Sequence, residues 1–280
     1  MEDADVVLRL EVAIELTRQA MIKLRSFHDL ARVRREVKNG EGFLTEADLA
    51  AEALILEGIR QRFPADEILS EESAPSCLEG YETKRALWVV DPLDGTTNFA
   101  FGLENYGVSI AFVNQAIPLF GVIGLPYYRK IFYGSRGDGR PIVLTYDHDI
   151  ELAVDSPIKV TREDNPKKAM LHHNWSYSNE AKRRVLLYME RLLAGDFLAV
   201  RGEGCAVAGI LSVARGRGHV YVQETLKPWD VAAAGLLVQL AGGTVTGMDG
   251  TPWHPFRHDI LASNGDLHPL LLQLLSGWDN

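Results

Sequence analysis

The chain has 280 residues, of which 46% are hydrophobic and 24% charged, and it carries a formal net charge of −9. That length allows one large domain or two of medium size, and the acidic balance argues against nucleic acid or an anionic membrane as the main partner. No apolar run in the sequence is long enough to span a bilayer, the two cysteines form no CxxC motif, and the acidic N-terminus is unlike a signal peptide. We therefore expect a cytoplasmic protein.

Two helices are predicted near the start of the chain. Residues 6–27 place hydrophobic side chains at three- and four-residue steps, which is the spacing of an amphipathic helix. The basic run over 32–38 is typical of a solvated helix end, and we expect a loop after it. The next helix begins at Thr45 and runs to about Phe63, because Thr45 as N-cap and Asp48 three residues later match a capping box.

An acidic pair, Glu71 and Glu72, follows the apolar residues Ile68 and Leu69. Such a pair usually belongs to a solvated surface, because ionised carboxylates are rarely buried without a partner. If Ile68 and Leu69 lie in a strand, however, the two carboxylates emerge at its end, where they can take part in a site.

A short buried strand is predicted over 87–90, where apolar, β-branched and aromatic residues follow one another. We expect it to end at Asp91, because Pro92 cannot donate to the hydrogen-bond ladder. Asp94 and Gly95 are typical of a turn, and Gly95 is free to adopt a positive φ. Two carboxylates therefore leave the end of one strand.

The segment 96–98 offers hydroxyl groups and backbone N–H groups at an expected helix start. Carboxylate oxygens bind hard divalent cations such as Mg²⁺, and the N–H groups at a helix start bind phosphate oxygens. A metal site beside a phosphate site is what a metal-dependent phosphatase requires. An ordinary turn followed by a helix cap explains the same residues equally well, so these residues alone leave both interpretations open.

The pattern of predicted elements changes around Asp155. Before it, further strands are predicted over 108–113, 119–125 and 131–133; after it, helices alternate with short strands. The strands of this second part are predicted over 169–172, 219–222 and 260–262, and its helices over 178–193, 205–214, 229–240 and near the C-terminus. This order predicts an α/β fold class, with an α+β half over residues 1–155 and an α/β half over residues 156–280.

The string Trp-Val-Val-Asp-Pro-Leu-Asp-Gly-Thr-Thr-Asn-Phe, residues 88–99, closely resembles the signature of the inositol monophosphatase family. Three further family motifs are matched in order: Glu-Glu-Ser from Glu71, Arg-x-x-Gly-x-Ala from Arg201, and Trp-Asp-x-Ala-Ala-x-Gly from Trp229. The resemblance covers nearly the whole chain. It implies the layered α-β-α-β-α architecture of the sugar phosphatases, with the main metal site in the first half and Asp230 supplied by the second.

The resemblance also implies roles for single residues. The metal ligands for two or three Mg²⁺ ions would be Glu71, Asp91, the carbonyl of Leu93, Asp94 and Asp230. The catalytic residues would be Glu71, Asp94 and Thr96, with Thr96 hydrogen-bonded near Glu71 to position a water molecule. The residues that support the metal ligands would be Lys38, Asp48 and Glu72. The substrate would be contacted by Asp94, Gly95, Thr96, Arg201, Gly204, Cys205, Ala206, Gln223 and Asp230.

The sequence departs from the family pattern at two of these positions. Cys205 stands where a hydroxyl residue is usual, and Gln223 stands where inositol-specific members carry Glu. Gln223 can still hydrogen-bond a hydroxyl but lacks the charge of Glu. The sequence therefore leaves open whether the protein strictly prefers inositol. Glu224 would face the opposite side of a strand. His172 and His173 would also point to opposite faces, so we do not expect them to bind one ion.

The resemblance implies Mg²⁺-dependent hydrolysis of a small sugar or polyol phosphate, such as inositol 1-phosphate, by a homodimer that Li⁺ inhibits. Fructose 1,6-bisphosphate is the main alternative substrate, followed by histidinol phosphate and 3′-phosphoadenosine 5′-phosphate. The last is disfavoured because the branches that use it tend to have Lys at the position of Thr97. A family member that acts by binding a protein or RNA would show a lost metal ligand or a large basic patch, and the sequence shows neither.

Overall fold

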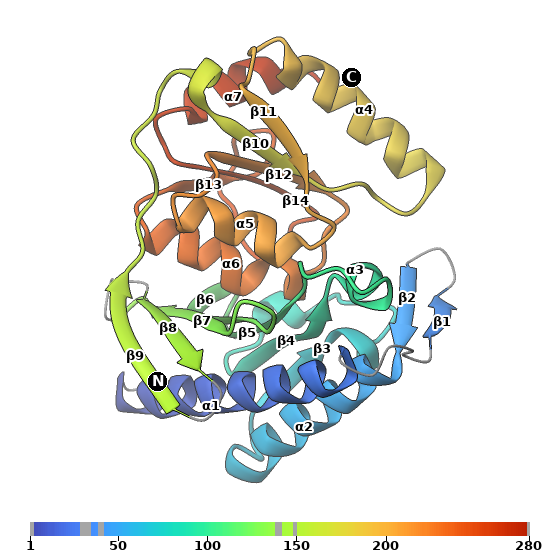
Figure 1. Ribbon diagram of the computed structural model, residues 1–280, viewed down its shortest axis with the longest axis vertical. Coiled ribbons are helices and arrows are strands. Elements are labelled where there is room, and N and C mark those ends of the chain that lie inside the picture. Colours follow the sequence, from blue (N-terminus) through green and yellow to red (C-terminus); the bar gives the residue numbers. More distant parts are fainter. Residues whose placement is uncertain (1–2, 29–34, 39–41, 138–141, 148–149, 279–280) are drawn as a thin grey trace.

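Helices and sheets alternate in five layers of the computed structural model, which describes residues 3–28, 35–38, 42–137, 142–147 and 150–278 (Figure 1). The outer layer at the bottom of Figure 1 consists of α1 (Asp3–His28) and α2 (Glu46–Arg62). Above it lie a seven-stranded sheet, then α5 (Ala206–Ala214) and α6 (Pro228–Leu240), then a five-stranded sheet. The top layer consists of α4 (Asn179–Leu193) and α7 (His268–Leu275). The predicted fold class and α-β-α-β-α layering are confirmed.

The seven-stranded sheet follows the chain order from β3 to β9, and all neighbours except β3 and β4 are antiparallel. Its strands are β3 (Glu67–Ser70), β4 (Leu87–Asp94), β5 (Gly107–Asn114), β6 (Ile117–Leu125), β7 (Lys130–Ser135), β8 (Ile142–Asp147) and β9 (Ile150–Pro157). The expected end of the central strand at Asp91 is wrong. Strand β4 continues to Asp94 because a register shift after Asp91 lets Asp94 pair again, with Gly107.

The five-stranded sheet has the order β11-β10-β12-β14-β13. Its strands are β10 (Met170–His173), β11 (Ala199–Gly202), β12 (Val220–Glu224), β13 (Thr244–Thr246) and β14 (Asp259–Ser263). β10 runs parallel to both of its neighbours, whereas β14 is antiparallel to β12 and β13. The prediction missed β11 and β13, which have four and three residues and are too short to show an alternating pattern.

A two-stranded antiparallel hairpin, β1 (Arg35–Lys38) and β2 (Gly42–Thr45), precedes α2. The end of the basic run is therefore a strand and not the helix end that we expected; residues 29–34 and the predicted loop residues 39–41 lie outside the described residues. The remaining short elements are the 3₁₀ turns η1 (Glu71–Ser73), η2 (Tyr81–Thr83) and η3 (Pro166–Lys168) and the one-turn helix α3 (Thr96–Ala100).

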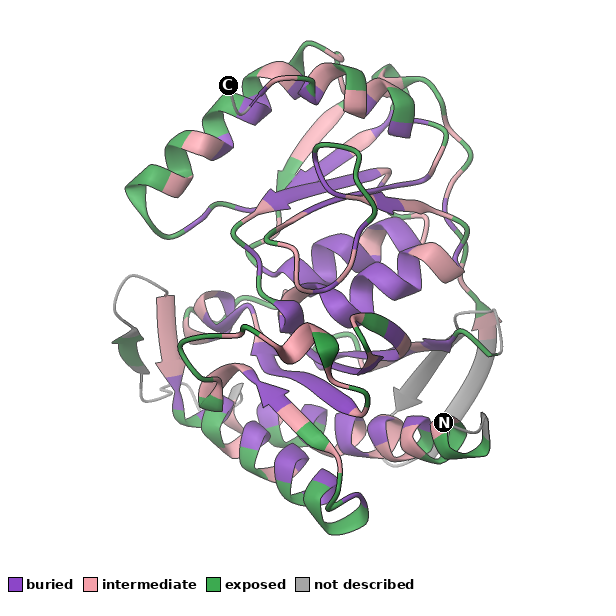
Figure 2. Cartoon of the chain, turned by 180° about the vertical axis from the view of Figure 1, so that it is seen from behind, coloured by how far each residue is buried: buried purple, intermediate pink, exposed green. Residues whose placement is uncertain are grey.

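The central helices α5 and α6 are almost completely buried, as the purple ribbons at the middle of Figure 2 show. They pack between the two sheets in one hydrophobic core. The approach is close, because a Cβ added to Gly121 in β6 would lie 2.7 Å from the Cα of Ala233 in α6. This packing fixes the beginnings of α5 and α6 near the end of β4.

Among the described helices, none has the length and hydrophobicity that crossing a membrane requires. The division into halves at residue 155 stays a prediction; β9 runs two residues past that boundary, to Pro157.

Candidate active site

Three carboxylates converge at the end of β4. Asp91 and Asp94 come from β4 itself, and Asp230 comes from the first turn of α6. Each offers an oxygen atom, and these oxygens all lie within 4.8 Å of one another. The register shift in β4 lies between Asp91 and Asp94, and both residues belong to the same end of the strand. The structure thus brings together residues that lie far apart in the chain.

The electrostatics of this group are unfavourable without a cation. Burial raises the pKa of Asp91 well above its usual range, and the neighbouring carboxylates, Glu71 first among them, raise it further. Burial likewise raises the pKa of Asp230, again with a contribution from the neighbouring acids. The pKa of Asp94 is raised by burial too, although hydrogen bonds from Cys205 and from backbone N–H groups act in the opposite direction. A bound cation would reverse these shifts.

The donor set fits a hard divalent cation. Asp91 Oδ1 accepts a hydrogen bond from the N–H of Leu93 at 3.0 Å, whereas its buried Oδ2 has no hydrogen-bond partner among the described residues. A buried carboxylate oxygen without a donor is costly unless an ion binds it. Glu71 opens η1 directly after β3, as predicted, and its charge acts on both Asp91 and Asp230. The group therefore offers the oxygen ligands that Mg²⁺ prefers.

A second set of hydrogen bonds supports the group from α2. The predicted capping box is present, with the Asp48 carboxylate accepting from the backbone N–H of Thr45 at 2.8 Å. The hydroxyl of Thr96 lies 2.9 Å from Asp48 Oδ1 and 2.9 Å from the carbonyl oxygen of Leu93. Burial raises the pKa of Asp48 to about 6, with a smaller contribution from Glu72. The hydrogen bonds of the Thr96 hydroxyl thus go to Asp48 and to Leu93, and its expected role near Glu71 stays a prediction.

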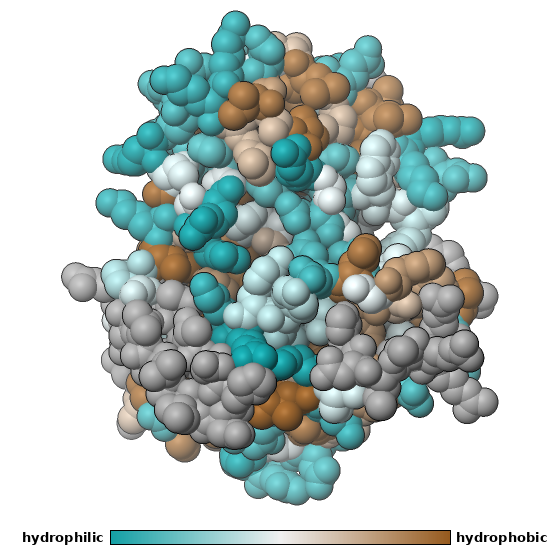
Figure 3. Space-filling view, in the orientation of Figure 1, coloured by the Kyte–Doolittle hydropathy of each residue, from teal (hydrophilic) through white to brown (hydrophobic). Residues whose placement is uncertain are grey.

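A cavity of about 1090 Å³ borders the carboxylate group. Figure 3 shows the surface hollowed on its right side, between the part that carries α4 and the part that carries α3. The predicted site residues that line the cavity are Asp94, Gly95, Gly204, Ala206, Gln223 and Asp230. The cavity is not lined by Thr96, Arg201 or Cys205; Arg201 Nη1 donates instead to the carbonyl of Val200. The side chain of Lys38 lies outside the described part of the structure.

Comparison with known proteins agrees with this geometry. The model of the inositol monophosphatase family matches residues 5–278. The chain belongs to this family. It is 32% identical over 278 residues to the inositol-1-monophosphatase of Synechocystis sp., a match that covers 98% of this chain and 90% of the relative.

Two further matches describe its relation to other members. A chloroplastic phosphatase of Arabidopsis thaliana is 32% identical over 239 residues; the match covers 83% of this chain and spans 61% of the length of that protein. The solved inositol monophosphatase of Anabaena (Nostoc) sp. superposes with a TM-score of 0.78 at 30% identity, covering 97% of this chain and 96% of that one. The inositol monophosphatase family consists of metal-dependent phosphatases, so the protein is a phosphoric monoester hydrolase that acts on phosphorylated substrates.

Cys205, the first departure from the family pattern, connects the carboxylate group to α5. Its thiol donates to Asp94 Oδ2 at 3.0 Å and accepts from the N–H of Ala208 at 3.4 Å, as the N-cap of α5. The N–H of Val207 also donates to Asp94 Oδ2, at 2.6 Å. Cys205 is buried, so it acts on the cavity through Asp94.

Gln223, the second departure, lines the cavity from the end of β12. Its Oε1 accepts a hydrogen bond from the hydroxyl of Tyr221, which in turn accepts from the amide of Asn174 at 3.1 Å. Glu224 faces the other side of the sheet, as expected, and binds Arg184 of α4 through two hydrogen bonds.

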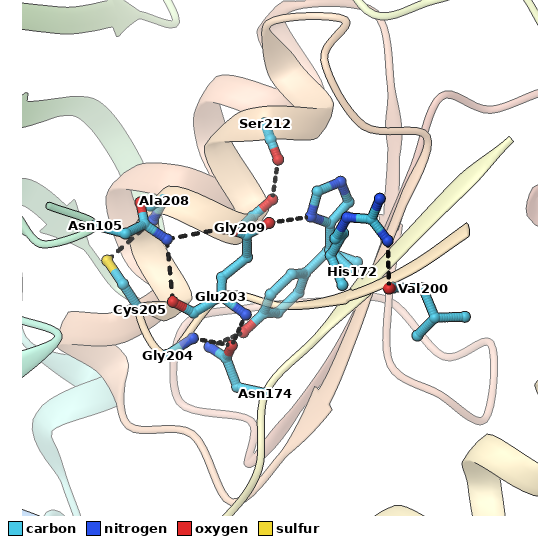
Figure 4. A network of polar contacts seen from close by, with 12 residues as sticks. Asn105, His172, Asn174, Val200, Glu203, Gly204, Cys205, Ala208, Gly209 and Ser212 are labelled. Carbon is cyan, nitrogen blue, oxygen red and sulfur yellow. Dashed lines mark hydrogen bonds and ion pairs between the residues drawn. The ribbon is translucent and has the colours of Figure 1, made fainter. Parts of the chain in front are cut away.

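No motif in the sequence predicts the hydrogen-bond network around Glu203 (Figure 4). Its carboxylate lies 2.7 Å from His172 Nδ1 and accepts from the amide of Asn105 at 2.8 Å. Its backbone N–H donates to Asn174 at 2.9 Å, and its carbonyl accepts from Asn98 at 2.9 Å. These bonds join the loop before α5 to the segment after α3. His172 is thus a partner of Glu203, and neither His172 nor His173 belongs to the potential metal group found among the described residues.

Proposed function

We propose that this family member is a Mg²⁺-dependent phosphomonoesterase that hydrolyses the phosphate ester of a small sugar or polyol, inositol 1-phosphate or a similar compound. One observation carries the proposal: the carboxylates of Asp91, Asp94 and Asp230 meet at the border of a cavity, and the buried Asp91 has an oxygen, Oδ2, with no partner among the described residues. Family membership supports the reaction class.

The carboxylates of Glu71, Asp91, Asp94 and Asp230, together with the carbonyl of Leu93, would hold two or three Mg²⁺ ions. Bound Mg²⁺ lowers the pKa of water and offsets the charge of the phosphate during hydrolysis. The supporting residues would act from outside this set: Asp48 accepts a hydrogen bond from Thr96, Glu72 acts on the charge of Asp48, and Lys38 is the last residue of β1.

Thr96 and Glu71 would position the attacking water. When the Thr96 hydroxyl donates its proton to Asp48 Oδ1, the lone pairs of Oγ1 are left to accept a hydrogen bond from a water molecule. Glu71, at the end of β3, would accept a proton from the same water. Asp48 therefore fixes the direction in which the Thr96 hydroxyl points.

The backbone N–H groups of Gly95 and Thr96 would bind the phosphate. Gly204, Ala206 and Gln223 line the same cavity and would contact the alcohol part of the substrate. Because Tyr221 occupies Oε1 of Gln223, the amide –NH₂ is the group of Gln223 that would donate to a substrate hydroxyl. For Arg201 and Cys205 we propose an indirect role, through the loop before α5 and through Asp94.

Phosphate release with and without Mg²⁺ tests the proposal, on inositol 1-phosphate, fructose 1,6-bisphosphate, histidinol phosphate and 3′-phosphoadenosine 5′-phosphate. We expect Mg²⁺-dependent turnover, fastest with inositol 1-phosphate. Faster turnover of another compound would change the substrate and keep the reaction. No turnover of any of the four with Mg²⁺ present would contradict the proposal and favour a protein that acts by binding. Homodimer formation, Li⁺ inhibition and a cytoplasmic location stay predictions.

A further inference from the structure

The cavity beside the carboxylate group has an acidic wall. Besides Asp94 and Asp230, it is lined by Glu104 and Glu203, and its described lining residues include no Lys or Arg. A phosphate ester is an anion, so it needs hydrogen-bond donors in addition to any cations that the carboxylates bind. In this cavity, neutral hydroxyl and N–H groups must supply those donors.

Tyr177 brings such a hydroxyl to the cavity from the side of the five-stranded sheet. It follows β10 on the connection to α4, lines the cavity, and is 53% exposed. Its phenolic oxygen lies 3.3 Å from Oγ1 of Thr97 in α3, which is long for an O–H···O bond, whose usual distance is about 2.7–2.8 Å. This is its one hydrogen-bond contact within the described residues, so the phenol keeps the capacity to donate elsewhere.

Packing fixes the ring of Tyr177 in this position. A Cβ added to Gly42 of β2 would lie 2.8 Å from Cζ of the ring and 2.9 Å from its hydroxyl oxygen. The ring therefore rests directly on this glycine, whose φ of +98° also favours glycine. Tyr177 belongs to the connection between β10 and α4, whereas Gly42 lies in β2 and Thr97 in α3. The phenol thus reaches from one side of the cavity to the other.

The hydroxyl also lies within the field of the candidate metal ligands. The part of the ring that lies against Gly42 is removed from water, and this partial burial raises the pKa of Tyr177; the charges of Asp94, Glu71 and Asp230 contribute in the same direction. The phenol is therefore protonated at neutral pH and can act as a donor. A Lys or Arg at this place would instead form ion pairs with the carboxylates and compete with a metal ion for them.

We propose that Tyr177 is a substrate-binding residue whose phenolic O–H donates a hydrogen bond to a phosphate oxygen of the bound ester. The inference rests on the proposed function, because it requires the phosphate to lie at the group of Asp91, Asp94 and Asp230. It adds a specific donor from the second part of the chain to a site whose other proposed phosphate donors come from the first.

The test compares the wild type with Tyr177→Phe and Tyr81→Phe. The phenylalanine at 177 keeps the ring against Gly42 and removes only the hydroxyl. Tyr81 of η2 is the control, because its ring packs against the hydrophobic core between the sheets and does not line the cavity. Steady-state kinetics would give kcat and KM for the best substrate. Isothermal titration calorimetry would give the Kd of Mg²⁺ and, with Mg²⁺ present, the Kd of inorganic phosphate.

We expect Tyr177→Phe to raise both KM and the Kd of inorganic phosphate about tenfold, the effect of losing one hydrogen bond to a charged group. The Kd of Mg²⁺ and kcat stay within about twofold of the wild type, because the lost bond is present in the ground state and the transition state alike. Tyr81→Phe matches the wild type in all four values.

An unchanged phosphate Kd in Tyr177→Phe would overturn the inference, since the hydroxyl would then not contact phosphate. A weaker Mg²⁺ affinity with an unchanged phosphate Kd would also overturn it, because Tyr177 would then support the metal site only. Absence of turnover in the wild type would contradict the proposed function instead, and the phosphate titration would still decide the role of Tyr177.

Discussion

Two acidic sites near the seven-stranded sheet differ in how their charge is compensated: the single carboxylate of Asp66, and the group of Asp91, Asp94 and Asp230. Asp66, just before β3, receives two hydrogen bonds from the guanidinium of Arg9 in α1, at 2.7 and 3.0 Å, and one from the indole of Trp88 at 2.9 Å. The guanidinium also lies over the ring of Phe63, 4.5 Å from its centroid. The chain itself thus neutralises this charge and satisfies its oxygens.

Within the described residues, the carboxylates of Asp91, Asp94 and Asp230 form no ion pair with a Lys or Arg, and the charge of Lys227 offsets the repulsion at Asp230 only in part. Burial and mutual repulsion raise the pKa of Asp91 and Asp230, and one oxygen of Asp91 has no partner among the described residues. Breaking a buried ion pair by removing one partner destabilises the fold, and carboxylates without a cation reduce its stability until an ion from solution binds them. The difference separates a structural site from a functional one.

The largest effect is expected from Asp94→Asn. The amide keeps the shape of the side chain, and its oxygen can still accept from the N–H of Val207, so the fold should persist. The variant loses the charge that would bind Mg²⁺, and with it several kcal/mol of transition-state stabilisation, which lowers kcat/KM at least about a thousandfold. Phosphate release measures the loss, and thermal melting checks the fold. Normal activity in a folded variant would remove Asp94 from the metal site.

The next effect is on stability and concerns the paired carboxylate. Arg9→Met keeps much of the side-chain volume but leaves Asp66 buried without its cation; the two side chains are 14% and 5% exposed. Removing one partner of a buried ion pair costs about 3–5 kcal/mol, which urea unfolding measures. Turnover at a temperature where both proteins are folded should not change.

The double variant Arg9→Met/Asp66→Asn is the control for this effect. It removes the unpaired charge as well, so it should recover part of the lost free energy of unfolding. Equal stability of Arg9→Met and the wild type would mean that the ion pair contributes nothing, and the contrast between the two sets of carboxylates would then fail.

Sequence alone predicts much of the fold because its main elements carry local signals. The capping box at Thr45 and the apolar run from Leu87 are contained within a few residues, and both appear as predicted. The hairpin β1–β2 and the strand β11 were missed because each of these strands has only four residues, too few to show an alternating pattern. The continuation of β4 past Pro92 depends on a bulge that only its neighbour β5 defines.

The candidate site shows the same limit. The carboxylates Asp91, Asp94 and Asp230 could be selected from motifs, but the partners of their neighbours could not. That Thr96 bonds to Asp48, and that Cys205 bonds to Asp94, follows from how α2 and α5 pack on the sheet. Tyr177 belongs to no motif; the role that we propose for it rests on its place in the cavity and on its contacts with Thr97 and Gly42, which only the fold brings near.

The smallest expected effect is the stabilisation of the fold by Mg²⁺ and its dependence on pH. The raised pKa values of Asp91 and Asp230 mean that the metal-free folded state holds protons that the unfolded state has released. The stability gained from these protons is fully present below the usual carboxyl pKa and is lost as the pH rises through the raised values. Mg²⁺ takes the place of the protons, so it should stabilise most near neutral pH and less in acid, where protons compete for the same oxygens.

At a hundred times its Kd, Mg²⁺ should raise the free energy of unfolding by about 2.7 kcal/mol near neutral pH, and clearly less at about pH 5. Urea unfolding in Mg²⁺ and in EDTA at the same pH gives this difference in the free energy of unfolding, and the contributions of the other titrating groups cancel in it. Asp91→Asn should lose the stabilisation and be more stable than the wild type in EDTA, whereas Arg9→Met should retain the stabilisation in full. Equal Mg²⁺ effects in these two variants would show that the ion does not bind the group of Asp91, Asp94 and Asp230, because only Asp91→Asn changes that group.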